Sequence, residues 1–180
     1  MAQKIQNVIL AGGSGNIGAA ILSKLLSSGS FKVSVLSRLE SKAVFPAEVK
    51  VHQVDYSYSS LVEAFQGQDA VVTALAHDAW PQQIPMIDAA VAAGVKRFIP
   101  SEYGSNTLNA KSIALVAPEL DIKVATLEYL KKQESTGLTW TGIATGAFFD
   151  WVSGRDPRAP ADHANIVIAG HPVRPVRPGH

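Results

Sequence analysis

Three glycines that follow a short apolar run carry the spacing most indicative of chemistry. The sequence V-I-L-A-G-G-S-G-N-I-G covers residues 8 to 18 and places Gly12, Gly15 and Gly18 at intervals of three. The four apolar residues before Gly12 have the length of a buried strand, and apolar residues recur with helical period from Ile17 onward. Strand, glycine-rich turn and helix together are the context that a dinucleotide-binding turn requires.

Each glycine has its own physical role in such a turn. Gly12 lets the chain turn tightly, Gly15 lets the backbone approach a pyrophosphate, and Gly18 lets the helix pack closely on the strand. The free N–H groups of the helix's first turn then point at the phosphates. We assign Ser14, inside the turn, to the same site. The spacing is G-x-x-G-x-x-G rather than G-x-G-x-x-G, and a turn that only connects a strand to a helix is the alternative.

Arg38 indicates which dinucleotide the turn would serve. It ends the second predicted strand, 20 positions after Gly18. An acidic residue at this place would bind the ribose of NAD, whereas a guanidinium can grip the 2′-phosphate of NADP with two hydrogen bonds. Ser37, Ser41 and Lys42 could add donors. The alternative is a solvated loop cation.

The rest of the chain alternates strands with helices and predicts an α/β fold, a Rossmann-like, doubly wound parallel sheet in three layers. Further strands are predicted over residues 31–36, 49–54, 69–75, 97–100 and 138–144. A capping box at Ser60–Glu63 opens a short helix, and Pro85 suits the first turn of the next one. Ligands bind at the carboxyl ends of parallel strands, so Thr73, Ala74 and Leu75 should face the cofactor.

Lys123 lies in a predicted helix from about residue 118 to Ser135. Helical periodicity places it on one arc with apolar residues, which are Leu120, Val124, Leu127 and Leu130. Burial there would lower the pKa of its amine and make it a candidate proton donor or acceptor. The opposite side of the helix is apolar too, and a lysine that extends along an apolar surface to solvent is the alternative. Periodicity alone favours this alternative.

Composition excludes several classes of protein. The 180 residues carry a net charge of +1, which gives no electrostatic case for nucleic acid or an anionic membrane. No cysteine is present, so disulfides and thiolate sites are excluded. No apolar run could span a bilayer and no signal pattern precedes the first strand, so we expect a cytoplasmic protein. The composition changes near residue 151. Residues 152–180 hold five of the ten prolines, and we expect them to be a disordered tail.

With these residues assembled, the chain resembles the NmrA-like and isoflavone reductase-like family of atypical short-chain dehydrogenase/reductases, most of all its fungal branch. The resemblance covers residues 1 to about 151. The motifs that carry it are the glycine-rich sequence at 8–18, R-F-I-P-S-E-Y-G at 97–104, Lys123 with E-Y-L-K-K, and T-W-T-G-I-A-T-G-A-F-F-D-W at 139–151. Family members continue for about a hundred residues that build a substrate-binding part, so we expect a chain truncated after about residue 151.

The resemblance implies an NADPH-binding Rossmann domain. Gly12, Gly15, Asn16 and Ile17 would lie against the pyrophosphate, and Arg38 against the 2′-phosphate. A lysine at the place of Lys123 is the general acid/base of the catalytic members, which reduce small aromatic, phenylpropanoid-like substrates. Further cofactor-site residues are expected at strand ends and in the last family motif: Asp55, Thr73, Ala74, Leu75, Ser101, Glu102 and Phe148.

Two classes of function remain in competition. One is an NADP-dependent oxidoreductase that transfers hydride, with Lys123 managing the proton. The other is a non-catalytic dinucleotide sensor that binds a regulatory protein partner; a homo-oligomer is also conceivable. An ordinary short-chain dehydrogenase would need Tyr-x-x-x-Lys, which is absent. No G-x-S-x-G marks a hydrolase, and His77-Asp78 lacks further ligands at metal spacing.

Overall fold

A computed structural model describes residues 4–107 and 120–146 of the chain. Phe148, the loop residues 108–117 and the predicted tail lie outside the described residues. The strands are β1 (Asn7–Ala11), β2 (Lys32–Arg38), β3 (Lys50–Val54), β4 (Ala70–Thr73), β5 (Arg97–Ile99) and β6 (Thr139–Trp140). The helices are α1 (Asn16–Ser27), α2 (Tyr58–Phe65), α3 (Gln83–Ala92) and α5 (Asp121–Gln133), with short 3-10 helices η1 (His77–Gln82) and η2 (Glu134–Thr136).

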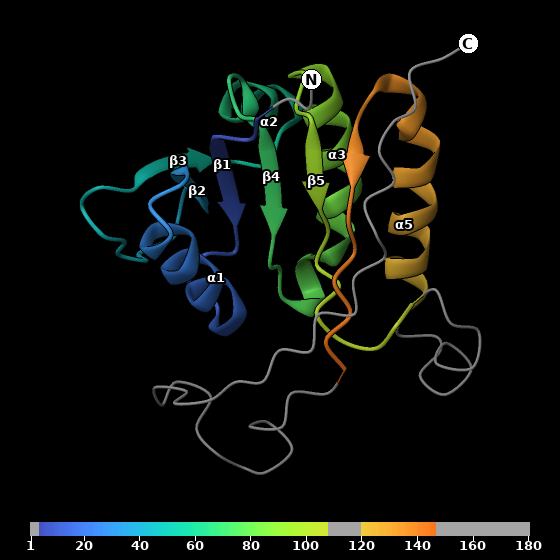
Figure 1. Cartoon of the computed structure of the whole chain (residues 1–180), viewed down its shortest axis with the longest axis horizontal. Helices are drawn as coiled ribbons and strands as arrows, with labels where there is room; N and C mark the ends of the chain where they lie inside the picture. Colours follow the sequence, from blue (N-terminus) through green and yellow to red (C-terminus); the bar gives the residue numbers. More distant parts are fainter. Residues whose placement is uncertain (1–3, 108–119, 147–180) are drawn as a thin grey trace.

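The six strands form one parallel sheet in the order β3-β2-β1-β4-β5-β6. Chain order reverses between β1 and β4, because β2 and β3 lie on one side of β1 while β4, β5 and β6 lie on the other (Figure 1). This is the switch point at which open α/β sheets bind ligands. The predicted doubly wound, Rossmann-like fold is confirmed.

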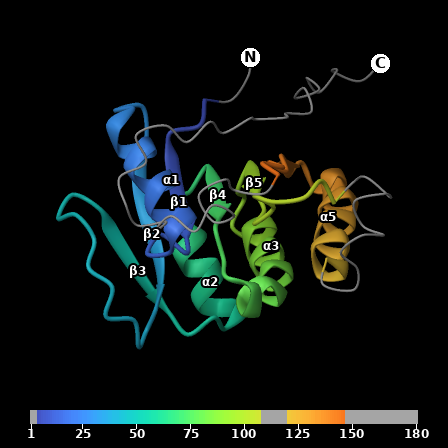
Figure 2. The same cartoon turned by 90° about the horizontal axis from the view of Figure 1, so that it is seen from below.

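Helices cover both faces of the sheet and complete the three layers. Helix α1 lies on one face, and α2, α3 and α5 lie on the other (Figure 2). Side chains alternate between the faces along each strand. Thus Val8 and Leu10 of β1 pack in the core under α1, and Ile9 packs in the larger core with Phe65 of α2 and Leu130 of α5. Within the described residues no helix is long and apolar enough to cross a membrane.

Asp69 ties the two halves of the sheet together at the amino ends of the strands. Its carboxylate accepts the backbone N–H of Gln6 and of Asn7, both at 2.9 Å, and the Lys96 ammonium at 2.6 Å. These hydrogen bonds and the ion pair hold the pKa of Asp69 at about 2. The start of β1 is thereby fixed to the start of β5.

Two strands are shorter than the sequence predicts. The prediction for β4 ran to Leu75, but the ladder ends at Thr73 because the N–H of Leu75 donates to the Ser101 hydroxyl at 2.9 Å instead. The prediction for β6 ran to Ala144, but its partner β5 has only three residues and supports only two in β6.

The predicted capping box at Ser60 is wrong. Helix α2 begins at Tyr58, and Ser57 is its N-cap, with the Ser57 hydroxyl accepting the N–H of Ser60. Asp55 fixes this earlier start, because its carboxylate accepts the N–H of Ser57 at 2.9 Å. The Ser60 hydroxyl donates to the same carboxylate at 2.6 Å and does not cap the helix.

Candidate active site

The glycine-rich turn is formed of bare backbone packed against the end of β4. Gly12 has φ +83°, and a Cβ on it would lie 2.2 Å from the carbonyl oxygen of Ala74. A Cβ on Gly18 would lie 1.9 Å from the carbonyl oxygen of Gly12. Both positions therefore exclude any side chain, and the two predicted roles of tight turn and close helix packing follow from the same contacts.

The N-terminus of α1 is open at this turn. Its N-cap is Gly15, which makes no side-chain hydrogen bond to the helix. The first N–H groups of a helix have no partner within it, so those of Asn16 and Ile17 are available to a ligand. Ser14, Gly15 and Asn16 are exposed. Bare backbone, unpaired N–H groups and the positive end of the helix dipole fit the pyrophosphate of a dinucleotide.

Arg38 and Asp55 lie at the same edge of the sheet. Ala11 pairs with Leu36, so Arg38 on β2 extends beyond the end of β1, alongside the glycine-rich turn, and its side chain is exposed. This is the position expected for a residue that reads the 2′ group of the ribose. Asp55 follows β3, and its hydrogen bonds at the start of α2 hold its pKa at about 2, so it remains anionic.

A closed ring of hydrogen bonds joins the ends of β4 and β5 to α3. The Ser101 hydroxyl donates to Thr73 Oγ1 at 2.9 Å, and the Thr73 hydroxyl donates to Gln83 Oε1 at 3.0 Å. The N–H of Ser101 donates to the same Gln83 oxygen at 2.7 Å. The Thr73 side chain is therefore buried in this ring, and only the backbone of Thr73 can face a cofactor. Ala74 and Leu75 follow it at the sheet edge, partly exposed.

Lys123 lies in the first turn of α5 and is buried, with 6% of its surface exposed. Its Nζ donates to the backbone carbonyl of Glu102 at 2.6 Å. Burial lowers the pKa of the Lys123 amine, and the Glu102 carboxylate partly opposes this. The interpretation favoured by periodicity, a lysine that extends to solvent, is wrong. Helical spacing could not show that a carbonyl 21 residues earlier would receive the ammonium.

Trp80 of η1 covers Lys123. The Lys123 Nζ lies 4.2 Å from the centroid of the Trp80 ring. The indole N–H of Trp80 donates to the carbonyl of Leu75 at 3.1 Å, and the His77 ring lies 4.5 Å away, centroid to centroid. Sequence reasoning missed Trp80. An aromatic residue five positions after the predicted end of a strand was the signal that could have indicated it.

The side chain of Glu102 has contacts of its own, apart from the backbone carbonyl that accepts the Lys123 ammonium. Its carboxylate is buried and accepts the Thr107 hydroxyl, and burial raises its pKa. A Cβ on Gly142 would touch Glu102 Cγ at 3.4 Å, which places that side chain between the segment after β5 and the segment after β6. Glu102 therefore holds Lys123 through its backbone carbonyl, and its carboxylate acts on the ammonium through its charge.

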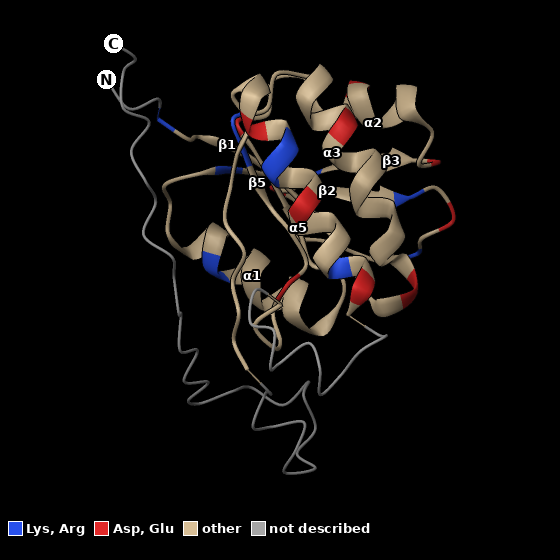
Figure 3. Ribbon diagram, turned by 90° about the vertical axis from the view of Figure 1, so that its right-hand side faces the viewer, with Lys and Arg blue, Asp and Glu red and all other residues tan. Residues whose placement is uncertain are grey.

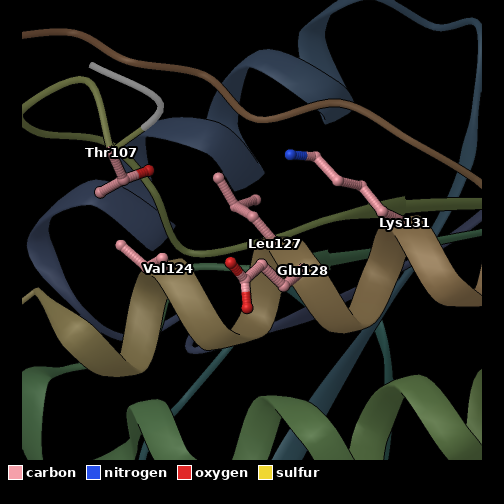
Figure 4. A pocket seen from close by; sticks show the side chains of 5 residues that line it. All are labelled: Thr107, Val124, Leu127, Glu128 and Lys131. Carbon is pink, nitrogen blue, oxygen red and sulfur yellow. The ribbon is translucent and has the colours of Figure 1, made fainter. Parts of the chain in front are cut away.

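Two hollows lie near these residues, and neither holds the whole predicted site. One, of about 180 Å³, lies beside α5 and is lined by Thr107, Val124, Leu127, Glu128 and Lys131 (Figure 4). It is smaller than a typical ligand pocket. The second hollow, of about 920 Å³, lies between Gly13, Ser14, the outer side of α1 and residues 43–48. Basic and acidic residues alternate along α5, which borders the first hollow (Figure 3).

The chain matches a protein family described as NAD(P)H-binding over residues 12–166. The match ends beyond residue 151, so the domain boundary near that residue stays a prediction. Two curated relatives are oxidoreductase aprR of Aspergillus flavus, 41% identical over 79% of this chain, and phenylcoumaran benzylic ether reductase Betv6 of Betula pendula, 28% identical over 82%. The matches cover 49% and 50% of those proteins, so this chain spans about half their length.

Solved structures show the same fold. AtPrR2, solved with NADP+ and (+)pinoresinol, aligns with TM-score 0.69 and 25% identity over 86% of this chain and 54% of its own. A crystal structure of isoflavone reductase aligns with TM-score 0.67 and 23% identity over 83% of this chain and 52% of its own. The glycine-rich turn, the parallel sheet and these matches agree, and the chain belongs to the NAD(P)H-binding oxidoreductases, in the NmrA-like and isoflavone reductase-like family.

Proposed function

We propose that this chain is the cofactor-binding part of an NADPH-dependent oxidoreductase that reduces a small aromatic substrate, with Lys123 as general acid/base. One observation carries the proposal, a continuous run of contacts between the glycine-rich turn and Lys123. Gly12 packs on Ala74, the N–H of Leu75 binds Ser101, and the carbonyl of Glu102 holds the Lys123 ammonium. A dinucleotide laid along this edge would have its pyrophosphate at one end and a buried amine at the other.

Arg38 supports NADPH rather than NADH as the cofactor. Its exposed guanidinium stands beside the glycine-rich turn, where the adenosine ribose of a dinucleotide lies in this architecture. A guanidinium can form two parallel hydrogen bonds to a phosphate. Bound there, the cofactor would supply a hydride.

Lys123 supplies the proton in this proposal. Because burial lowers its pKa, the ammonium releases a proton more readily at neutral pH than an exposed lysine does. The carbonyl of Glu102 accepts one of the three N–H groups of the ammonium and fixes its direction. In the proposal, another N–H group of the ammonium donates to a substrate oxygen.

The substrate class rests on the relatives. Betv6 is a phenylcoumaran benzylic ether reductase, and AtPrR2 was solved with pinoresinol. Both names indicate small aromatic compounds, and we extend that class to this chain. This chain spans only about half the length of those proteins. The substrate is therefore tested with a panel of compounds rather than with a single one.

A Lys123→Met variant tests the function, with Lys132→Met as the matched control on an exposed position of α5. Binding of NADPH is followed by its fluorescence, and oxidation of NADPH is followed with a panel of isoflavonoid and lignan compounds. We expect all three proteins to bind NADPH alike. Turnover should fall by about 10²- to 10⁴-fold in Lys123→Met and stay unchanged in Lys132→Met.

Three results separate the possibilities. Equal turnover by the two variants would contradict the role of Lys123. Tight NADPH binding by the wild-type chain without oxidation in any assay would favour the dinucleotide sensor over the enzyme. A wild-type chain that folds but binds neither NADPH nor NADH would overturn both.

A further inference from the structure

We propose that Trp80 is a positioning residue for Lys123, whose indole ring holds the buried ammonium against the carbonyl of Glu102. The inference rests on the proposed role of Lys123 as proton donor. Helix η1 contains none of the site residues that the sequence predicts, and the inference adds it to the site.

The indole ring is itself fixed by the sheet. The N–H of Trp80 donates to the carbonyl of Leu75 at 3.1 Å, and Leu75 is held by the Ser101 hydroxyl at 2.9 Å. The ring is therefore tied to the ends of β4 and β5, the same strand ends that carry Glu102. Lys123 arrives from α5 and meets a ring and a carbonyl that are both anchored independently of its own helix.

The geometry fits a cation–π contact. A cation within about 6 Å of an aromatic centroid is attracted to the ring face, most strongly to tryptophan and most of all when water is excluded. The Lys123 Nζ lies 4.2 Å from the Trp80 centroid and the side chain is buried. The carbonyl directs one N–H of the ammonium and the ring restrains the group from another side, so the side chain loses the rotational freedom that an exposed lysine keeps.

Several other groups face this ammonium or the ring that covers it. The Glu102 carboxylate, from the segment after β5, favours the charged lysine, whereas burial disfavours it. The His77 ring of η1 lies tilted against the Trp80 ring, 4.5 Å between centroids, and the half-buried Tyr103 follows Glu102 in the chain. Asp121 begins the same helix as Lys123. The indole ring adds to the Glu102 carboxylate in favouring the ammonium form.

Trp80 fluorescence tests the contact in the apoprotein. With Trp140 and Trp151 replaced by Phe, Trp80 is the single tryptophan of the chain, and its emission is followed from pH 5 to 11. We expect an alkaline change that disappears in Lys123→Met. Tyrosine ionisation affects the emission of both proteins equally, so the difference between their curves reports the titration of Lys123. Identical curves for the wild-type background and Lys123→Met would overturn the contact.

If the variant with Trp140 and Trp151 replaced by Phe does not fold, the wild-type chain is compared with Trp80→Phe. The difference between their emissions then gives the pH dependence of Trp80. This measurement needs neither cofactor nor turnover, so its failure is distinct from failure of the proposed function.

Activity tests the positioning role. The basic limb of the kcat/KM profile should move to lower pH by about half a unit in Trp80→Leu, because the ammonium stays buried without the ring. Trp80→Phe keeps an aromatic face and should restore most of the wild-type profile. A Trp80→Leu profile that is unshifted, or that moves to higher pH, would contradict the proposal. NADPH affinity should be equal in all of these variants.

Discussion

Gly18→Ala should damage the fold and the cofactor site together. The added Cβ would lie 1.9 Å from the Gly12 carbonyl oxygen and 2.7 Å from its carbon, and both atoms are backbone. Relieving this contact requires the turn to move by about 1 Å away from α1. Overpacking of this kind costs about 1–3 kcal/mol, and a backbone obstacle places it at the upper end. Alanine is the better helix former by about 1 kcal/mol, so the net loss should be about 2 kcal/mol.

For a chain of this size, such a loss lowers Tm by about 4–8 °C. Thermal melts and urea titrations of the apoprotein measure it. Because the displaced turn carries the N–H groups that face the pyrophosphate, NADPH affinity should also fall by at least about tenfold. A Gly18→Ala protein that melts within about 1 °C of wild type would refute the close approach of α1 to the turn.

Gly15→Ala is the matched comparison. Its Cβ would meet the Gly12 oxygen at 3.4 Å, an ordinary contact, and its backbone φ of −79° suits any residue. We therefore expect stability within about 1 kcal/mol of wild type but weaker NADPH binding, because the methyl group stands where the pyrophosphate approaches. Unchanged binding would show that the phosphates lie elsewhere.

Two further predictions concern charges. Arg38→Glu should shift preference from NADPH toward NADH by about 10- to 100-fold in the ratio of Kd values; an unchanged ratio would remove Arg38 from the 2′-phosphate site. Asp69→Asn should cost about 1–2 kcal/mol at pH 7. The folded pKa of Asp69, about 2, is below its usual 3.8, so the carboxylate stabilises the fold above that range and loses this effect as the pH falls from 3.8 to 2. Melts of the two proteins should therefore converge toward pH 2, and a constant difference would contradict the assignment.

The geometry of the glycine-rich turn was predictable because its signals are local. Gly12 and Gly18 lie within one strand–turn–helix unit, and the contact that excludes a side chain at Gly18 involves a residue six positions away. The place of Arg38 beyond the end of β1 was predictable from the length of one helix and one strand, and its contact with a 2′-phosphate stays a prediction. Backbone sterics within a short segment determine such features, so the spacing of residues in the sequence predicts them.

The surroundings of Lys123 depend on contacts between distant segments. Lys123 is buried because η1 and the segment after β5 close over it, and neither is visible in the period of its own helix. Thr73 was expected to face the cofactor, but a glutamine ten residues later takes its hydroxyl into the interior. The resemblance indicated the importance of Lys123, but only the structure supplied its partners.

The hydrogen-bonded ring of Thr73, Gln83 and Ser101 lowers the entropy cost of binding a ligand. The Ser101 hydroxyl donates to Thr73, and the Thr73 hydroxyl is shared between Gln83 Oε1 and the Ile99 carbonyl. The glutamine oxygen accepts twice, so no member can rotate without breaking hydrogen bonds. The strand ends beside Lys123 therefore lose their conformational entropy when the chain folds. A ligand that arrives there meets a preorganised surface and does not have to order it, which leaves more of its contact energy for affinity.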